Sequence, residues 1–143
     1  MKSWIFVRIA SVIAFLYCAA HTAGAPWIPE KGPDAMALIG SMKSHAFEVQ
    51  GARVTYWGFY FGFGVMISVF LLLLAVLLWQ LGSMQRRGTA PTRTAIASIL
   101  AAYVVNAAIA WKYFFVGPVA LAAAIVLCLA VALGLARGDR RSG

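Results

Sequence analysis

The stretch YWGFYFGFGVMISVFLLLLAVLLWQL, residues 56–81, decides the fold of this chain. It contains no Asp, Glu, Lys or Arg, and aromatic side chains are concentrated in its first turns. A helix of this length is about 39 Å long, which exceeds the roughly 30 Å hydrocarbon core of a bilayer. We therefore predict a membrane-spanning helix over residues 56–81, with its aromatic start in the headgroup layer.

The composition of the whole chain is that of an integral membrane protein. Of its 143 residues, 63% are hydrophobic and only 11% are charged, and the mean hydropathy is +0.86. A soluble domain of this size needs more polar side chains at its surface. The net charge of +8 comes from Lys and Arg residues that flank apolar runs and form no stripe interleaved with aromatic residues. We therefore expect no nucleic-acid partner.

Three more apolar runs predict further spans, at residues 4–25, 95–111 and 118–136. The first run has a second interpretation, because Ala23, Gly24 and Ala25 match the small-x-small pattern of a signal-peptide cleavage site. Cleavage there would leave Pro26 as the first mature residue, and the run is long enough to span, so we favour a retained helix. The predicted fold is all-α, an integral membrane four-helix bundle forming a single transmembrane domain over residues 1–143.

Residues 26–55 form the only long polar connection between spans. Its prolines predict an extended start, and a short amphipathic helix capped by Asp34 is expected to follow in this outer loop. The apolar arc of this helix consists of Ala35, Met36, Ile39, Met42, Ala46 and Phe47. Gly51 predicts a turn, and Thr55 is placed to cap the second span.

The distribution of the 12 Lys and Arg residues predicts the orientation. With four spans, eight of them share a side with both termini: Lys2, Arg8, Arg86, Arg87, Arg93, Arg137, Arg140 and Arg141. The other four are Lys31, Lys43, Arg53 and Lys112. Because cytoplasmic loops carry the excess of basic residues, we predict a multi-pass protein of a bacterial inner membrane with both termini in the cytoplasm.

Few polar side chains fall inside the predicted spans. His21 and Tyr60 lie about 6 Å and Asn106 about 9 Å below the outer interface, so they are candidates for one ligand site for a lipid headgroup, a quinone carbonyl or haem. The alternative is that His21 only holds helices together by hydrogen bonding. No carboxylate lies deep in a span, which argues against a membrane isomerase or a proton-coupled exporter. We expect no catalytic residue, metal or cofactor, no Cys18–Cys128 disulfide, and a solvated His45.

Gly58 and Gly62 lie on one face of the second predicted span, opposite most of its aromatic residues. Glycines four residues apart let another backbone approach closely, which favours helix packing in lipid. The alternative is that the aromatic side lines an apolar pocket at the outer leaflet.

The residues MKSHAF at 42–47, followed by TYWGFYFGFG at 55–64, resemble a group of uncharacterised small bacterial inner-membrane proteins. In that group, a Tyr-Trp-x-Phe-Tyr-x-Gly-Phe-Gly run opens the second of four spans. The similarity covers about residues 34–81. It implies a four-helix bacterial membrane protein and no particular activity.

These features predict a non-enzymatic accessory or binding component of the membrane. Its expected surroundings are the lipid bilayer and either further copies of the chain or a membrane-protein partner. One alternative function is a lipid, quinone or haem site formed by His21, Tyr60 and Asn106. A second alternative is a small transporter, which requires a polar path through the spans.

Overall fold

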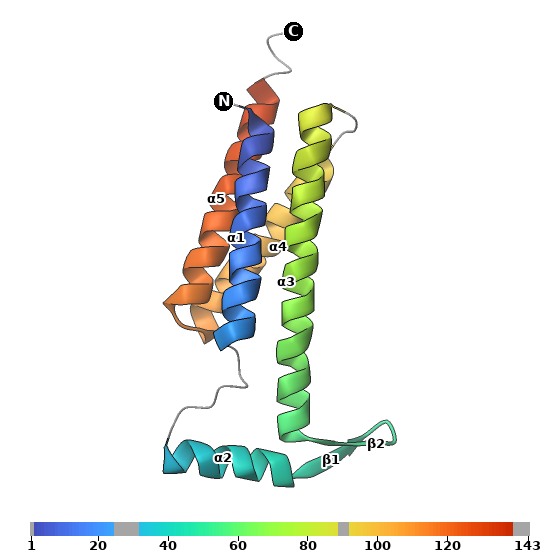
Figure 1. The fold of residues 1–143 in the computed structure, drawn as a ribbon, viewed down its shortest axis with the longest axis vertical. Coiled ribbons are helices and arrows are strands. Elements are labelled where there is room, and N and C mark those ends of the chain that lie inside the picture. The colour runs from blue at the N-terminus through green and yellow to red at the C-terminus, as the bar shows by residue number, and fades with distance from the viewer. Residues whose placement is uncertain (1, 25–31, 89–91, 139–143) are drawn as a thin grey trace. The chain divides into compact units, whose positions relative to one another are not determined.

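The computed structural model describes residues 2–24, 32–88 and 92–138 (Figure 1). Its elements in chain order are α1 (Ser3–Gly24), α2 (Pro33–Ser44), β1 (Ala46–Val49), β2 (Ala52–Thr55), α3 (Tyr56–Arg87), α4 (Arg93–Tyr113) and α5 (Val116–Gly138). Four of these helices, α1, α3, α4 and α5, are long and apolar enough to cross a membrane. The all-α prediction is confirmed, and the chain is a multi-pass membrane protein.

The second spanning helix is longer than predicted. We placed a loop from Gly82 onward, but α3 continues to Arg87. Met, Gln and Arg are good helix formers, and the two arginines of the last turn favour the negative end of the helix dipole. Gly88 then takes a φ of 66°, the left-handed conformation that commonly ends helices. Gly82 is therefore a residue of the helix interior.

The turn between the last two spans is shorter than the connection predicted between residues 111 and 118. α4 ends at Tyr113, and the amide of Phe114 closes the helix by donating to the carbonyl of Ala110 at 2.9 Å. α5 begins at Val116, so Pro118 lies in its first turn instead of starting it. Proline is tolerated there because the first amides of a helix have no partner within the helix.

The segment between the first two spans contains the predicted short helix, with different ends. α2 begins with Pro33, and Gly32 at its N-cap makes no side-chain capping bond. The prediction that Asp34 is the cap was wrong, because Pro33 occupies the first helical position and the helix starts two residues earlier. Asp34 lies in the first turn, where its charge still favours the helix dipole. The extended start predicted at Pro26 and Pro29 lies outside the described residues.

A β-hairpin follows α2, and the predicted continuation of the helix through Ala46 and Phe47 was wrong. β1 and β2 pair antiparallel with Phe47 opposite Val54 and Glu48 opposite Arg53. Gln50 and Gly51 form the two-residue loop, with φ values of 49° and 80°. Two positive φ values are the signature of the hairpin turn that matches strand twist. The turn predicted at Gly51 is thus confirmed, but we had not predicted strands on either side of it.

The chain divides into two units by its internal contacts. The first unit comprises Met1–Tyr17 and Leu71–Gly143, and the second comprises Cys18–Phe70. α1 and α3 each contribute one part to both units. In the first unit, the start of α1 and the end of α5 lie at the same end (Figure 1).

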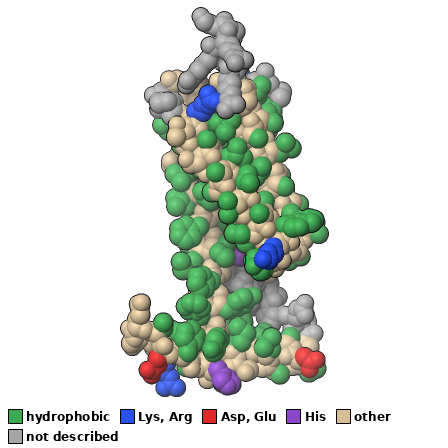
Figure 2. Space-filling model, turned by 180° about the vertical axis from the view of Figure 1, so that it is seen from behind, with side chains coloured by type: hydrophobic (Ala, Val, Ile, Leu, Met, Phe, Trp, Pro, Cys, Tyr) green, Lys and Arg blue, Asp and Glu red, His purple; other side chains and the backbone are tan. Residues whose placement is uncertain are grey.

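The core of the first unit is apolar and draws on all four spanning helices. It contains Val7, Ala10, Ala14, Ala75, Leu78, Ile96, Tyr103, Ala122, Ile125, Leu129 and Ala132. Many of these are alanines, which let helix backbones approach closely where lipid supplies no hydrophobic driving force. The outward faces also carry many exposed large hydrophobic residues, and green side chains are spread along the helical surface in Figure 2. Such a surface suits a lipid solvent.

Candidate functional site

A cluster of polar side chains joins α1 to α3 in the second unit. The Cys18 thiol donates a hydrogen bond to the Ser68 carbonyl at 3.3 Å. The Thr22 hydroxyl donates to the Ser68 hydroxyl at 3.0 Å, and that hydroxyl donates in turn to the carbonyl of Gly64 at 3.4 Å. Two i, i+4 pairs on facing helices therefore form one connected network.

His21 belongs to the same cluster. Its Nε2 lies 3.1 Å from the carbonyl oxygen of Gly64, which is buried, while the imidazole itself is half-buried. A carbonyl oxygen only accepts hydrogen bonds, so Nε2 carries the proton and donates. In this arrangement Nε2 has no lone pair to offer to haem iron. The bond is the helix-to-helix link that we gave as the alternative role of His21.

The three predicted ligand residues have different surroundings. Tyr60 is 49% exposed, and its ring lies 5.9 Å from that of Trp57 on the same helix. Asn106 is exposed on α4 and belongs to the first unit. His21 therefore contacts Gly64, and Tyr60 contacts Trp57. Asn106 belongs to the other unit and is not part of the polar cluster between α1 and α3 in the second unit.

A shallow groove borders the polar cluster. It is lined by Thr22, Phe61, Val65 and Ser68 and has a volume of about 270 Å³. Sites for small organic ligands usually measure about 300–1,000 Å³ and have apolar walls with a few polar groups. This groove likewise has two hydroxyls among apolar side chains. Its volume is below the usual range, so it could hold only part of such a ligand.

The glycines of α3 differ in what surrounds them. At Gly62 an added Cβ would meet no described atom within 4 Å, and at Gly58 it would meet the Thr55 hydroxyl at 3.1 Å. At Gly82 it would lie 3.0 Å from Cγ of Arg8 and 3.5 Å from the carbonyl oxygen of Trp4. Gly82 is therefore a glycine at which α1 approaches α3 closely. Sequence reasoning missed it because we placed it in a loop.

Aromatic rings attach the hairpin of β1 and β2 to the start of α3. The ring of Phe47 in β1 lies 4.8 Å from that of Tyr56 and 5.7 Å from that of Phe59. The ammonium of Lys43 lies 5.2 Å above the Trp57 ring, a cation–π contact. These contacts lie within the second unit. They give the aromatic side of α3 a role in holding the hairpin.

The start of α3 is capped as predicted. The amide of Gly58 donates to the Thr55 hydroxyl at 3.0 Å, which satisfies one of the amides that have no partner within the helix. Thr55 is also the last residue of β2, so one side chain ends the hairpin and begins the spanning helix.

The remaining residues singled out from the sequence behave as packing or surface groups. His45 is exposed, as predicted, and its Nδ1 donates to the carbonyl of Ser41 at 2.9 Å. Cys18 is buried and Cys128 half-buried, and both are free thiols. Over residues 2–24, 32–88 and 92–138, no group of three or more His, Cys, Asp or Glu side chains could hold a metal ion.

Sequence reasoning singled out His21 but missed its partners. The available signal was the repeated spacing of four residues, Cys18 to Thr22 and Gly64 to Ser68, in two neighbouring spans. We had assigned Cys18 only a packing role and had not singled out Thr22. No family model, curated protein or solved structure matches the chain.

Proposed function

We propose that the protein is a non-enzymatic accessory or binding component of a bacterial inner membrane, with both termini in the cytoplasm. Two sequence features support this location: the excess of basic residues near the termini and in the middle loop, and the resemblance of residues 34–81 to four-span bacterial proteins. An even number of spanning helices, with the start of α1 and the end of α5 at one end of the first unit, is compatible with it.

The orientation is tested by labelling introduced cysteines with a membrane-impermeant reagent in intact cells. Thr94, at the start of α4, and Ala37, in the middle of α2, are both exposed and have ordinary helical surroundings. We expect Ala37→Cys to react and Thr94→Cys to react only after the membrane is opened. The native chain, whose two cysteines lie in spanning helices, gives the background. Reaction of Thr94→Cys in intact cells would contradict the orientation.

The observation that carries the binding role is the organised segment between α1 and α3. α2 has no buried residue, and Met36 and Leu38 are 69% and 63% exposed. The hairpin is held by ring contacts and by the Thr55 cap, so the segment presents its apolar side chains from a fixed base. An exposed apolar surface outside the spanning helices is typical of a site for a protein or membrane partner.

A photoreactive side chain at Leu38 tests this role in native membranes. We expect a discrete protein adduct at Leu38 that is lost when Met42, one turn along the same face of α2, is changed to Glu. The matched control is the same photoreactive group at Leu127, which is 66% exposed on α5 and should give lipid adducts. Lipid adducts alone at both positions would overturn the partner-binding role and leave α2 as a membrane-surface helix.

The groove beside His21 supports a second candidate function, binding of a quinone or another small apolar ligand. Its hydroxyls from Thr22 and Ser68 stand beside the Phe61 ring, which is a suitable surface for a carbonyl-bearing ring. Against it, the polar groups of the cluster already bond to each other and to main-chain carbonyls.

The second candidate is tested by extracting the purified protein for quinones and by recording its absorption spectrum for a haem Soret band. A stoichiometric quinone, reduced by Val65→Trp, which fills the groove, would support ligand binding. Val69→Trp, on an outward position 60% exposed one turn along α3, is the matched control. Lipid alone in the native preparation would remove this candidate.

A further inference from the structure

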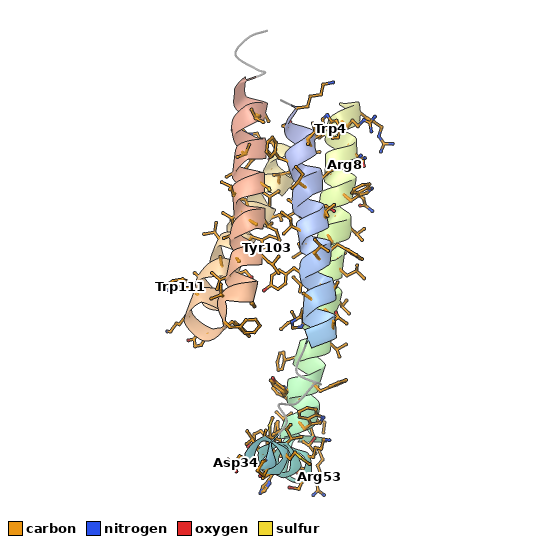
Figure 3. The ribbon with its side chains drawn as sticks, turned by 60° about the vertical axis from the view of Figure 1, so that its left-hand side comes forward. Trp4, Arg8, Asp34, Arg53, Tyr103 and Trp111 are labelled. Atoms are coloured by element: carbon orange, nitrogen blue, oxygen red, sulfur yellow. The ribbon has the colours of Figure 1, made fainter. Side chains whose placement is uncertain are left out.

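Arg8 occupies an unusual position for a charged side chain in the second turn of α1. Its guanidinium carbon lies 4.4 Å from the centre of the Trp79 ring on α3 and 5.5 Å from that of Trp4 (Figure 3). Nη2 donates to the Ser83 hydroxyl at 3.1 Å, whereas the buried Nε has no hydrogen-bond partner among the described residues. The cation is thus held between two tryptophans with one of its donors unused.

A second cation shares the same ring. The guanidinium carbon of Arg86, near the end of α3, lies 5.2 Å from the centre of the Trp4 ring. We call Trp4, Arg8, Trp79 and Arg86 the Arg–Trp cluster. Close packing at Gly82 fixes it, because the α3 backbone there contacts the Arg8 stem. All four residues lie within the first unit.

The positive charge of the Arg–Trp cluster is not balanced by the described part of its unit. Residues 2–17, 71–88 and 92–138 contain no Asp or Glu. Two guanidinium groups around one ring repel each other, and a partly buried donor without a partner costs free energy. An anion within reach of both guanidinium groups offsets the repulsion between them. Phosphate is the matching one, since the planar guanidinium fork binds its oxygens in a bidentate manner.

An apolar groove begins at the same place. It has a volume of about 440 Å³ and is lined by Trp4, Ile5, Arg8, Ile9, Val12 and Ile13. These residues follow one face of α1 for about 13 Å, close to the roughly 15 Å depth of one hydrocarbon leaflet. The apolar stem of Arg8 lines this groove, and its guanidinium belongs to the Arg–Trp cluster, so one side chain connects the two.

We propose that the Arg–Trp cluster and this groove form a binding site for an anionic phospholipid. The lipid phosphate contacts Arg8 and Arg86, and one acyl chain lies along α1 over Ile9 and Val12. The groove distinguishes this ligand from free phosphate, which has no apolar part to bury. Basic pockets between spanning helices are known to take lipid headgroups, and tryptophans are enriched at that depth. The site is separate from the His21 cluster and from α2.

Native mass spectrometry of the full chain in neutral detergent tests the proposal. The probes are phosphatidylglycerol and phosphatidylcholine with identical acyl chains, and inorganic phosphate in excess as competitor. We expect about a tenfold preference for phosphatidylglycerol that excess phosphate does not abolish. Arg8→Gln and Arg86→Gln should each lower the affinity for phosphatidylglycerol by about fivefold. Lys112→Gln, which removes a cation above Tyr113 at the α4–α5 turn, should leave it unchanged.

Circular dichroism establishes whether each variant is folded. If Arg8→Gln unfolds, the lipid preference of Arg86→Gln tests the proposal alone, because Arg86 is exposed and its replacement should not disturb the fold. Equal binding of the two lipids by the native chain would overturn the proposal. So would a preference that survives in every folded arginine variant. Full displacement of phosphatidylglycerol by inorganic phosphate would show a phosphate site only and would also overturn it.

Discussion

The two units of this chain are held together by different interactions. In the first unit, α1, α3, α4 and α5 meet mainly through small apolar residues, and five of the eleven core residues are alanines. Two hydrogen bonds also join α1 to α3 there, from Ser11 to the Ala75 carbonyl and from Arg8 to Ser83. In the second unit, α1 and α3 are joined by hydrogen bonds from Cys18, His21, Thr22 and Ser68, and the hairpin is held by aromatic rings. Changes in side-chain volume should therefore matter most in the first unit, and changes in hydrogen bonding in the second.

The largest effect is expected from truncating the core of the first unit. Leu78 is fully buried on α3, so Leu78→Ala should lower the free energy of unfolding by about 2–5 kcal/mol, from lost contacts and a cavity. Leu72, on the same helix, is 44% exposed, and Leu72→Ala should change it by less than about 0.5 kcal/mol. Denaturant titration in mixed micelles measures both. Equal losses would mean that α3 does not pack as described.

Overpacking the close approach at Gly82 should be the next most damaging change. Gly82→Leu places new atoms against Arg8 and the Trp4 carbonyl, so we expect a loss of about 1–3 kcal/mol. The new side chain of Gly62→Leu meets none of the described atoms closely, and the change should be neutral or slightly stabilising, because leucine favours the helix over glycine. We had expected Gly62 to be a glycine at which two helices of the chain pack. The pair Gly82→Leu and Gly62→Leu tests instead whether Gly82 has that role.

The Gly62 variant also tests contacts between copies. A large loss for Gly62→Leu, alongside a lower mass of the complex in light scattering, would show that Gly62 packs against a second copy of the chain. A loss without a change in mass would contradict the open surroundings of Gly62.

Most of the fold followed from the sequence because lipid imposes a simple rule on it. Each span must be apolar and about 20 residues long, so composition alone reveals the four crossings. The ends were less predictable. Residues 82–87 continue α3 because their propensity is helical, and hydropathy does not detect that. The hairpin at residues 46–55 was missed because Gln-Gly is a weaker turn signal than Asn-Gly.

The candidate site was less predictable than the fold. His21 stood out as a polar residue in a span, but its partner is the main-chain carbonyl of Gly64, and a sequence does not show which carbonyl a side chain will reach. Arg8 was read only as a flanking charge that sets orientation. Its position between two tryptophans depends on the rotation of α1 relative to α3, which the close approach at Gly82 sets.

Removing the cap of α3 should have a moderate effect on the second unit. Thr55→Ala leaves the Gly58 amide without its partner, so we expect the unfolding free energy to fall by about 1 kcal/mol. Thr55→Ser keeps the hydroxyl and should recover most of that loss. Faster amide hydrogen exchange in the first turn of α3 should accompany Thr55→Ala. If exchange there is unchanged, the cap does not hold the helix start.

The smallest effect expected is the loss of one hydroxyl from the polar cluster. Ser68→Ala removes the group that accepts from Thr22 and donates to Gly64, and it leaves the Ser68 carbonyl that Cys18 uses. Such links between helices are worth about 0.6 kcal/mol on average, because unfolded segments in a membrane also find partners. We therefore expect a loss of about that size in the same titration.

Ser98→Ala is the matched control for Ser68→Ala, since Ser98 is exposed and its hydroxyl donates only to the Thr94 carbonyl of its own helix. A difference between the two variants measures the link between α1 and α3, because each loses one local i−4 bond. If they are equal, the cluster contributes nothing beyond local bonds. The second unit would then be stabilised by the aromatic contacts of Phe47 and by the Thr55 cap. The claim that hydrogen bonds between α1 and α3 stabilise this unit would be wrong.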